Sequence, residues 1–210
     1  MVKNSNSPII YVVDDDISVC RALTLLLKSH GFKVETFTQA AEFLSFKHPK
    51  VASCLILDIR LPNINGFALQ EAMTRRGIAT PIIFITGYGD IPMSVKAMRA
   101  GAIDFLSKPF TKKKLFNAIT LAISRSKVQN KKQAEITKIK RNINSLSPRE
   151  LEVFRFVAQG MLNKEIASKR GTSLQTIKVH RGRVMQKLQA RTVTELIHLA
   201  QKAGITSSKQ

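Results

Sequence analysis

Acidic side chains, a threonine and a lysine each follow or end an apolar segment within the first 110 residues of the chain. Asp14–Asp16 follow one such segment, Asp58 ends a second, Thr86 ends a third, and Lys108 follows a fourth. Two or three carboxylates can hold a hard cation such as Mg²⁺, which prefers oxygen ligands. A cation and a lysine would together offset the charge that builds on phosphoryl oxygens during transfer. This set favours a phosphoryl-accepting site, in which Asp58 forms an acyl phosphate and the Thr86 hydroxyl bonds a phosphoryl oxygen.

Strand-like and helix-like segments alternate over the first 124 residues and must position these groups. Three of the five predicted strands are continuous apolar runs, which is typical of strands covered on both faces. Five βα units in series indicate an α/β fold, a doubly wound parallel five-stranded sheet with the strand order 2-1-3-4-5. The predicted strands are Ile9–Val13, Lys33–Phe37, Cys54–Asp58, Ile82–Thr86 and Asp104–Ser107.

The carboxyl ends of these strands should meet at one edge of the sheet, where ligands bind in doubly wound folds. Taken singly, each group is a weak signal, because a run of aspartates is more often a solvated turn than a metal site. Lys108 alone could be any surface lysine. The convergence of four strand ends makes the signal specific. The strand Lys33–Phe37 contributes no comparable group, which is expected because it lies at the edge of the sheet.

Four motifs in this part of the chain resemble those of response-regulator receiver domains, and the resemblance covers essentially all of residues 8–124. It implies that a sensor histidine kinase phosphorylates Asp58, and that Phe105 changes rotamer together with Thr86 on activation. It also implies a cis Lys108–Pro109 bond, since cis bonds are essentially confined to X–Pro. The motifs are Val12-Val13-Asp14-Asp15-Asp16, Leu57-Asp58-Ile59-Arg60-Leu61-Pro62, Ile85-Thr86-Gly87-Tyr88-Gly89-Asp90 and Lys108-Pro109-Phe110.

The same resemblance implies a magnesium site in the receiver domain. We expect Mg²⁺ to be the cofactor, because the receiver family uses it for phosphorylation. The implied ligands are the carboxylates of Asp14, Asp15 and Asp58 and the backbone carbonyl of Arg60.

Positive charge is concentrated toward the carboxyl end of the chain, whose formal net charge is +20. Residues 125–144 hold seven basic residues and one acidic residue, and residues 145–210 hold twelve and four. Such a bias suits a polyanionic partner, nucleic acid before a membrane surface. Charge alone leaves open the alternative that basic residues simply keep a domain soluble.

Residues 125–144 are interpreted as a helical basic linker between a receiver domain at 1–124 and a second domain at 145–210. The linker contains no glycine or proline, and a heptad-like apolar seam runs along it into the second domain. Four positions are too few for a coiled coil, so packing of this seam on a neighbouring domain is favoured over pairing with a second linker. The seam consists of Ile136, Ile139, Ile143 and Leu146.

The chain after Ser145 is predicted to be a small all-α domain of four helices. Its first helix begins at Ser147-Pro148-Arg149-Glu150, which combines an N-cap serine, a proline at the first helical position and a capping-box glutamate. A short helix at 164–169, a turn with Gly171 and a longer helix to about Leu188 follow, and Thr172 with Gln175 is predicted to cap the longer helix. This order is a helix-turn-helix, and Thr192–Ala203 makes the fourth helix.

Motifs in this domain resemble those of LuxR-type DNA-binding domains, and the whole chain looks like the FixJ-like branch of that response-regulator family. The resemblance implies that the third helix enters the major groove. Gly182 departs from relatives that carry a basic residue at its position. The motifs are Leu146-Ser147-Pro148-Arg149-Glu150, Asn163-Lys164-Glu165-Ile166-Ala167 and Thr176-Ile177-Lys178-Val179-His180-Arg181.

Residues of the third helix can be sorted by angle, at about 100° per residue. One arc is apolar and predicted to be core, namely Leu174, Ile177, Val184, Met185 and Leu188. The other arc is predicted to be exposed and includes Gln186. The predicted DNA-contacting residues of this helix are Gln175, Thr176, Lys178, Val179, Gly182 and Arg183.

Arg181 falls in the middle of the apolar arc. A buried arginine needs a carboxylate partner, which Glu165 or Glu150 could supply. A structural role for Arg181 is therefore favoured over a DNA contact.

The rest of the composition fits a cytoplasmic protein. No apolar run approaches the roughly 18–20 residues that a membrane span needs, and Cys20 and Cys54 are expected to be buried thiols. The expected function is that of a two-component response regulator, not an enzyme. We expect phosphorylation of Asp58 to promote homodimerisation and sequence-specific DNA binding that regulates transcription. The expected partners are DNA, a sensor histidine kinase, a second copy of the chain and RNA polymerase, and none is a membrane.

Two alternatives stay open. The first is a metal-dependent phosphohydrolase of the haloacid-dehalogenase type with Asp58 as nucleophile. Such enzymes require a second aspartate two positions after the nucleophile as the acid and base. This chain has Arg60 there, which counts strongly against a phosphohydrolase. The second is a DNA-binding protein whose receiver has become a constitutive dimerisation module, against which the intact acceptor set argues.

Overall fold

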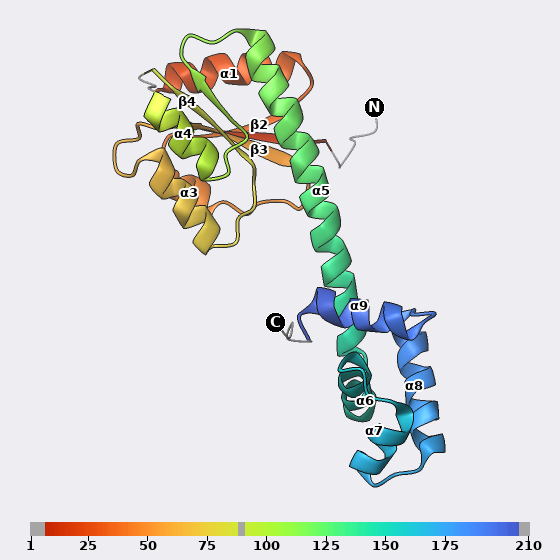
Figure 1. Cartoon of the computed structure of the whole chain (residues 1–210). Coiled ribbons are helices and arrows are strands. Elements are labelled where there is room, and N and C mark those ends of the chain that lie inside the picture. Colours follow the sequence, from red (N-terminus) through yellow and green to blue (C-terminus); the bar gives the residue numbers. More distant parts are fainter. Residues whose placement is uncertain (1–6, 88–90, 206–210) are drawn as a thin grey trace. The chain divides into compact units, whose positions relative to one another are not determined.

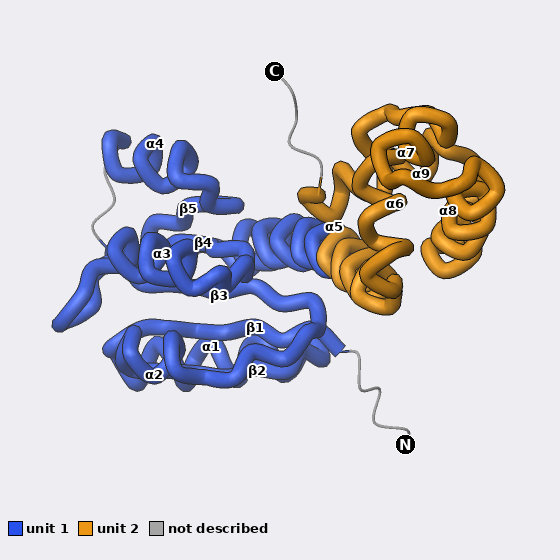
Figure 2. Tube along the Cα trace, turned by 90° about the horizontal axis from the view of Figure 1, so that it is seen from below, with its two compact units in different colours: residues 1–131 blue, residues 132–210 orange. Residues whose placement is uncertain are grey.

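The computed structural model describes residues 7–87 and 91–205. The chain divides into two compact units, residues 1–131 and 132–210, which Figure 2 colours separately. The predicted motif residues Tyr88, Gly89 and Asp90 lie outside the described residues. Within the described ranges, no helix is both long enough and apolar enough to span a membrane.

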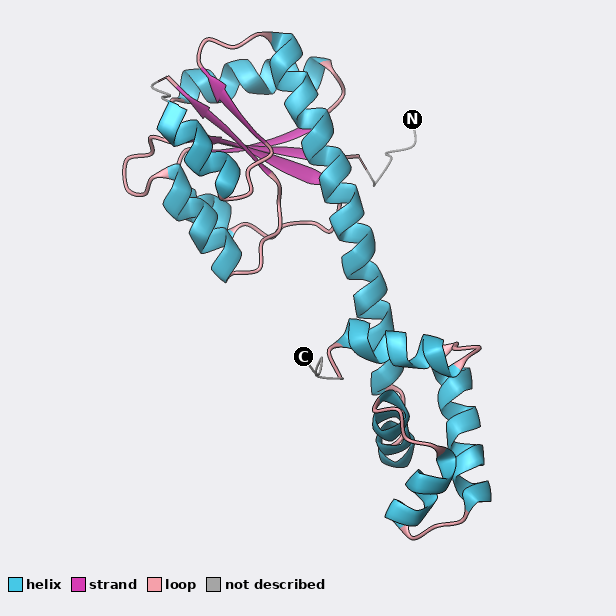
Figure 3. Cartoon of the chain, in the orientation of Figure 1, coloured by secondary structure: helices cyan, strands magenta, loops and turns pink. Residues whose placement is uncertain are grey.

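The first unit contains a five-stranded parallel sheet with the order β2-β1-β3-β4-β5, which confirms the predicted fold class. Four strands have the predicted bounds, and the central one begins a residue earlier than predicted. Figure 3 shows the strands of this sheet in magenta. They are β1 (Ile9–Val13), β2 (Lys33–Phe37), β3 (Ser53–Asp58), β4 (Ile82–Thr86) and β5 (Asp104–Ser107).

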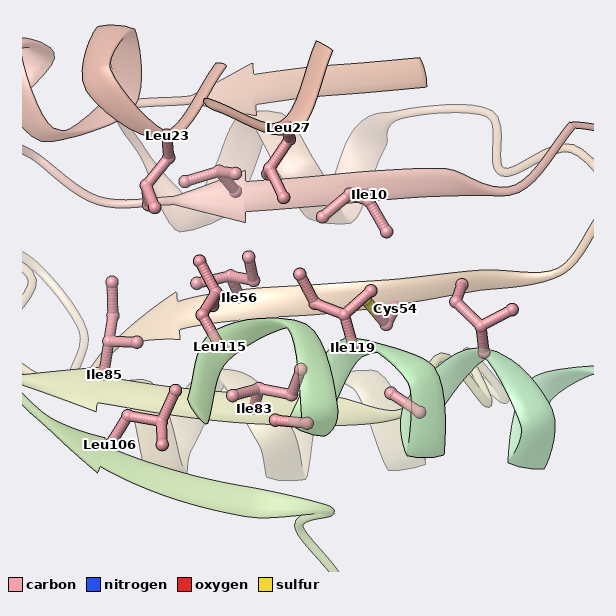
Figure 4. Close-up of a cluster of buried hydrophobic side chains, with 14 of the residues drawn as sticks. Ile10, Leu23, Leu27, Cys54, Ile56, Ile83, Ile85, Leu106, Leu115 and Ile119 are labelled. Carbon is pink, nitrogen blue, oxygen red and sulfur yellow. The ribbon is translucent and has the colours of Figure 1, made fainter. Parts of the chain in front are cut away.

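Helices cover both faces of this sheet (Figure 1). The helices α1 and α5 pack on one face and α2, α3 and α4 on the other, which explains why β1, β3 and β4 are buried along their whole length. Figure 4 shows side chains of α1 and α5 meeting those of the central strands. The five helices are α1 (Ile17–Ser29), α2 (Ala40–Ser45), α3 (Gly66–Arg75), α4 (Ile91–Arg99) and α5 (Lys112–Asn144).

Local signals in the sequence explain where these elements begin. Asp16 caps α1, because its carboxylate accepts a hydrogen bond from the Ser18 backbone N–H at 2.7 Å. Cys20 and Cys54 are buried and free, as predicted. Lys108–Pro109 is the cis peptide bond of the described chain, as the resemblance implied.

The long helix α5 contributes to the core of each unit. Its first half carries Leu115 and Ile119 into the sheet core, and its second half carries Ile139 and Ile143 into the core of the second unit. The predicted linker segment is therefore helical, and most of its apolar seam packs on the second unit. The two units divide inside that segment, at Lys131 and Lys132, whereas the predicted domain boundaries stand at its ends.

Four further helices follow in the second unit, as predicted. Ser147 and Glu150 form the predicted capping box of the first, with Glu150 N donating to Ser147 Oγ at 3.3 Å and Ser147 N to Glu150 Oε2 at 2.8 Å. The predicted cap at Thr172 is wrong by one residue, because Ser173 Oγ accepts from Thr176 N at 3.0 Å. The helices are α6 (Pro148–Ala158), α7 (Asn163–Arg170), α8 (Leu174–Leu188) and α9 (Val193–Ala203).

Candidate functional site

Two buried carboxylates and a lysine meet at the carboxyl edge of the sheet. Asp14 is 1% exposed and Asp58 is 6% exposed. Lys108 Nζ donates to Asp14 Oδ2 at 2.8 Å and to Asp58 Oδ1 at 3.1 Å. These residues are far apart in sequence, and the convergence expected of the strand ends brings them together.

Strand register and backbone hydrogen bonds hold each carboxylate in place. Val13 pairs with Leu57, so the residues that follow them lie side by side. The second oxygen of each carboxylate is fixed by a backbone N–H two residues later: Asp14 Oδ1 accepts from Asp16 N at 3.0 Å, and Asp58 Oδ2 accepts from Arg60 N at 2.7 Å. Each carboxylate therefore presents one oxygen to its own loop and the other to Lys108.

Burial and the opposed charges shift the titration of this cluster. Burial raises the pKa of Asp58 above its ordinary value, although the hydrogen bond and charge of Lys108 oppose this shift. Burial disfavours the charged form of Lys108, but its hydrogen bonds to Asp14 and Asp58 outweigh that effect and raise the pKa of the ammonium group. Lys108 is thus held as a cation beside the buried carboxylates.

The other residues predicted for this site take different positions. Thr86 ends β4 with a side chain that is 1% exposed, and its carbonyl accepts from Lys108 N at 2.7 Å. Phe105 lies half-buried in β5 and packs against the core under α2, α3 and α4. Asp15 is exposed. Among the described residues, no three His, Cys, Asp or Glu side chains lie together in an arrangement that could hold a metal ion.

Gly66 has a role at this site that the sequence analysis did not assign. It begins α3 directly behind the end of β3, and a Cβ atom there would lie 2.8 Å from the Asp58 carbonyl oxygen and 3.1 Å from Phe84. Only glycine permits this close approach of helix to strand. The available sequence signal is the position of this glycine, shortly after the Asp58 motif.

The predicted DNA-contacting residues all lie on the exposed side of α8. Ile177, Val184 and Leu188 are buried as predicted, and Met185 is half-buried. The prediction for Leu174 is wrong, because its side chain is 44% exposed. The exposed set is Gln175, Thr176, Lys178, Val179, Gly182 and Arg183.

Arg181 is half-buried, and its partner differs from the prediction. Its Nη1 donates to Asn163 Oδ1 at 2.8 Å, not to a carboxylate. Glu150 pairs instead with Lys187 Nζ at 2.6 Å, and Glu165 accepts from the Leu162 backbone N–H at 2.7 Å. Arg181 thus ties α8 to the start of α7 through an amide.

Comparison with known families matches both units. The family described as the response regulator receiver domain matches residues 10–120. The family described as bacterial regulatory proteins of the luxR family matches residues 144–200. The first match covers the sheet and the acidic edge, and the second covers α6 to α8 and most of α9.

Relatives similar to this chain share both parts. Nodulation protein W of Bradyrhizobium diazoefficiens is 44% identical over 97% of this chain and 90% of that protein. Response regulator protein TmoT of Ectopseudomonas mendocina is 41% identical over 95% of this chain and 90% of that protein. The solved structure of the response regulator StyR matches with a TM-score of 0.77 and 42% identity, over 93% of this chain and 99% of that one. The chain therefore belongs to the response regulators that join a receiver domain to a LuxR-type DNA-binding domain.

Proposed function

We propose that Asp58 accepts a phosphoryl group from a sensor histidine kinase, and that this event promotes dimerisation and sequence-specific DNA binding. The observation that carries the proposal is the single Lys108 ammonium bound to both buried carboxylates at 2.8 and 3.1 Å. A cation fixed beside two buried carboxylates is an arrangement that stabilises charge developing on phosphoryl oxygens. Asp58 Oδ1, which faces Lys108, is the oxygen that attacks phosphorus.

The donor set at this edge fits Mg²⁺ in its chemistry. Asp14 and Asp58 supply hard carboxylate oxygens, and Mg²⁺ is usually held by one or two carboxylates together with waters and phosphate. The Arg60 carbonyl and the exposed Asp15 complete the proposed set. Bound Mg²⁺ would neutralise charge on the phosphoryl oxygens, and the chain's own part is to hold the two carboxylates and Lys108 in register.

Thr86 and Phe105 are proposed to report the modified state of Asp58. Thr86 ends the strand beside β3, and its register places it next to Ser107 of β5. Its hydroxyl would bond a phosphoryl oxygen on Asp58, which draws the end of β4 toward β3. Phe105, on β5, would then take a new rotamer and change the surface around β5 that favours a second copy of the chain.

The exposed arc of α8 is proposed to enter the major groove of DNA. Its Lys178 and Arg183 supply charged donors, and Gly182 leaves a gap in the side chains of that arc. Paired DNA-binding units would occupy two half-sites and so bind more tightly than one. Such binding regulates transcription in the cytoplasm, with RNA polymerase as a further partner.

We propose a regulatory role and not an enzymatic one. A phosphohydrolase with Asp58 as nucleophile needs an acid and base two residues later, and Arg60 stands there. The Arg60 backbone N–H bonds Asp58 Oδ2 and its side chain is exposed. This geometry supports storage of a phosphoryl group on Asp58.

The test is phosphate incorporation from a small phosphodonor in the presence of Mg²⁺. Asp58→Asn should abolish phosphate incorporation. The variant should still be folded and should still show a cooperative thermal unfolding transition. Asp104→Asn is the matched control. Asp104 begins β5 and so lies at the amino edge of the sheet, away from the acidic carboxyl edge. This variant should incorporate phosphate at the parental level. Phosphate incorporation by the Asp58→Asn variant at the parental level would show that Asp58 is not the acceptor.

The metal set is tested separately. Asp15→Asn should weaken Mg²⁺ binding, measured by titration calorimetry, because one hard oxygen ligand is exchanged for an amide. Unchanged affinity would remove Asp15 from the set.

A further inference from the structure

A pocket of about 310 Å³ opens in the second unit where α6, the turn after α7 and the first half of α8 meet. This volume is at the small end of the range for ligand pockets, roughly 300–1,000 Å³. Its lining combines arginine, threonine and histidine side chains and contains no acidic residue. The lining residues are Arg149, Val153, Arg170, Gly171, Thr172, Thr176, Ile177 and His180.

The lining of this pocket carries an excess of positive charge. Glu152 faces both arginines: Arg170 Nη1 lies 2.6 Å from Glu152 Oε1, and Arg149 Nη1 lies 3.7 Å from Glu152 Oε2. One carboxylate thus offsets two guanidinium groups. The Arg149 side chain is 66% exposed, and a long, exposed pair of this kind contributes little. Arg149 can therefore leave Glu152 for an anion at small cost, while Arg170 stays fixed.

The pocket lies along one flank of the arc that is proposed to face DNA. Thr176 and His180 are one turn apart on α8 and line the pocket, and Gln175 and Val179 beside them are exposed. An α-helix about 10–12 Å across fills a major groove about 12 Å wide, so the sugar–phosphate strands pass along its flanks. The amino-terminal half of a recognition helix is the part that reaches the bases.

We propose that this pocket binds one backbone phosphate of double-stranded DNA, with Arg149 as its main ligand. The hydroxyls of Thr172 and Thr176 are the neutral donors of the site. Phosphate contacts from arginine and threonine fix the register of a protein on the duplex without reading its sequence. The inference rests on the proposed function of α8 and adds a ligand from α6, outside the helix-turn-helix itself.

The experiment measures binding of the full-length chain to a mixed-sequence duplex by fluorescence anisotropy, over a series of KCl concentrations. One lost phosphate contact reduces the slope of log K against log[salt] by about 0.9. The affinity lost at ~0.1 M salt is then about eightfold. Arg149→Gln should show both effects, and Arg149→Lys, which keeps the charge, should retain most of the slope.

Arg155→Gln is the matched control. Arg155 is exposed on the same helix but lies about 240° round it and does not line the pocket. Its replacement removes the same charge and should leave the slope unchanged. Equal effects of the two variants, or no effect of Arg149→Gln, would overturn the phosphate site while leaving DNA binding by α8 intact. Failure of the unchanged chain to bind any duplex, with or without a small phosphodonor and Mg²⁺, would overturn the proposed function and this inference together.

Circular dichroism melting of each variant separates binding from folding. Arg149 is largely exposed, so its variants should melt with the parent protein. If Arg149→Gln lowered the melting temperature as well as the affinity, the residue would be a structural one and the proposal would be wrong.

Discussion

The carboxyl-terminal half of α5 should be essential to the stability of the DNA-binding unit. Ile139 and Ile143 are 7% and 6% exposed and belong to the core formed by α6, α7, α8 and α9. A fragment that begins at Lys132 keeps both side chains, whereas the predicted domain 145–210 lacks them. We expect the fragment 132–210 to unfold cooperatively and the fragment 145–210 to be largely unfolded.

The magnitude follows from the buried side chains. Burial of one isoleucine contributes about 1.5–3 kcal/mol, so the loss of two removes about 3–6 kcal/mol. A domain of this length has a free energy of unfolding of roughly 4–12 kcal/mol, at about 0.05–0.15 kcal/mol per residue. The loss is therefore comparable to the whole stability of the unit.

The assay is urea denaturation of both fragments, followed by far-ultraviolet circular dichroism. Within 132–210, Ile143→Ala should cost about 2–5 kcal/mol. Lys140→Ala, exposed on the same helix, should stay within about 0.5 kcal/mol of the parent. Equal urea midpoints for the two fragments would refute the reasoning, because α5 would then contribute nothing to this core.

Three further substitutions test single contacts. Gly66→Ala should cost about 1–3 kcal/mol in thermal unfolding and slow phosphorylation, because its Cβ would lie 2.8 Å from the Asp58 carbonyl oxygen; a fully stable, active variant would contradict this. Tyr11→Phe should stabilise the protein by about 1 kcal/mol and so raise the urea midpoint, because the buried hydroxyl has no hydrogen-bond partner in the described part of the chain. A lower midpoint would mean that this hydroxyl does make a stabilising hydrogen bond. Glu150→Gln should flatten the loss of stability in acid. The hydrogen bond from Lys187 lowers the pKa of Glu150, so its contribution is present above the ordinary glutamate value and is lost as pH falls below about 4.5. Parallel pH profiles for variant and parent would exclude that pair as the source.

The acidic edge was predictable because it depends on topology more than on side-chain packing. Once β1, β3, β4 and β5 are recognised as parallel strands, their carboxyl ends must meet, and Asp14, Asp58, Thr86 and Lys108 come with them. The sequence does not reveal that Lys108 bonds both carboxylates. That depends on a strand register which apolar runs, alike on both faces, do not specify.

The second unit shows where periodicity stops being informative. The angular position of Leu174 on α8 matches the core, but its side chain is 44% exposed. Angle predicts which way a side chain points and not whether a neighbouring helix reaches that turn. The same limit applies to the cap of α8, where Ser173 and Thr172 are both suitable residues and the end of the helix decides between them.

For Arg181, the sequence predicts the burial of the side chain but not its hydrogen-bond partner. Its angular position on α8 correctly predicts that the side chain turns toward the protein, but the partner is the Asn163 amide and not a carboxylate. The two predicted carboxylates are each engaged at a helix start: Glu150 caps α6 and binds Lys187, and Glu165 caps α7. Because Leu162 at the N-cap of α7 has no capping side chain, the sequence contains no Ser/Thr-x-x-Glu signature that would assign Glu165 to this helix start. A half-buried arginine keeps part of its hydration, so a neutral amide suffices as its partner.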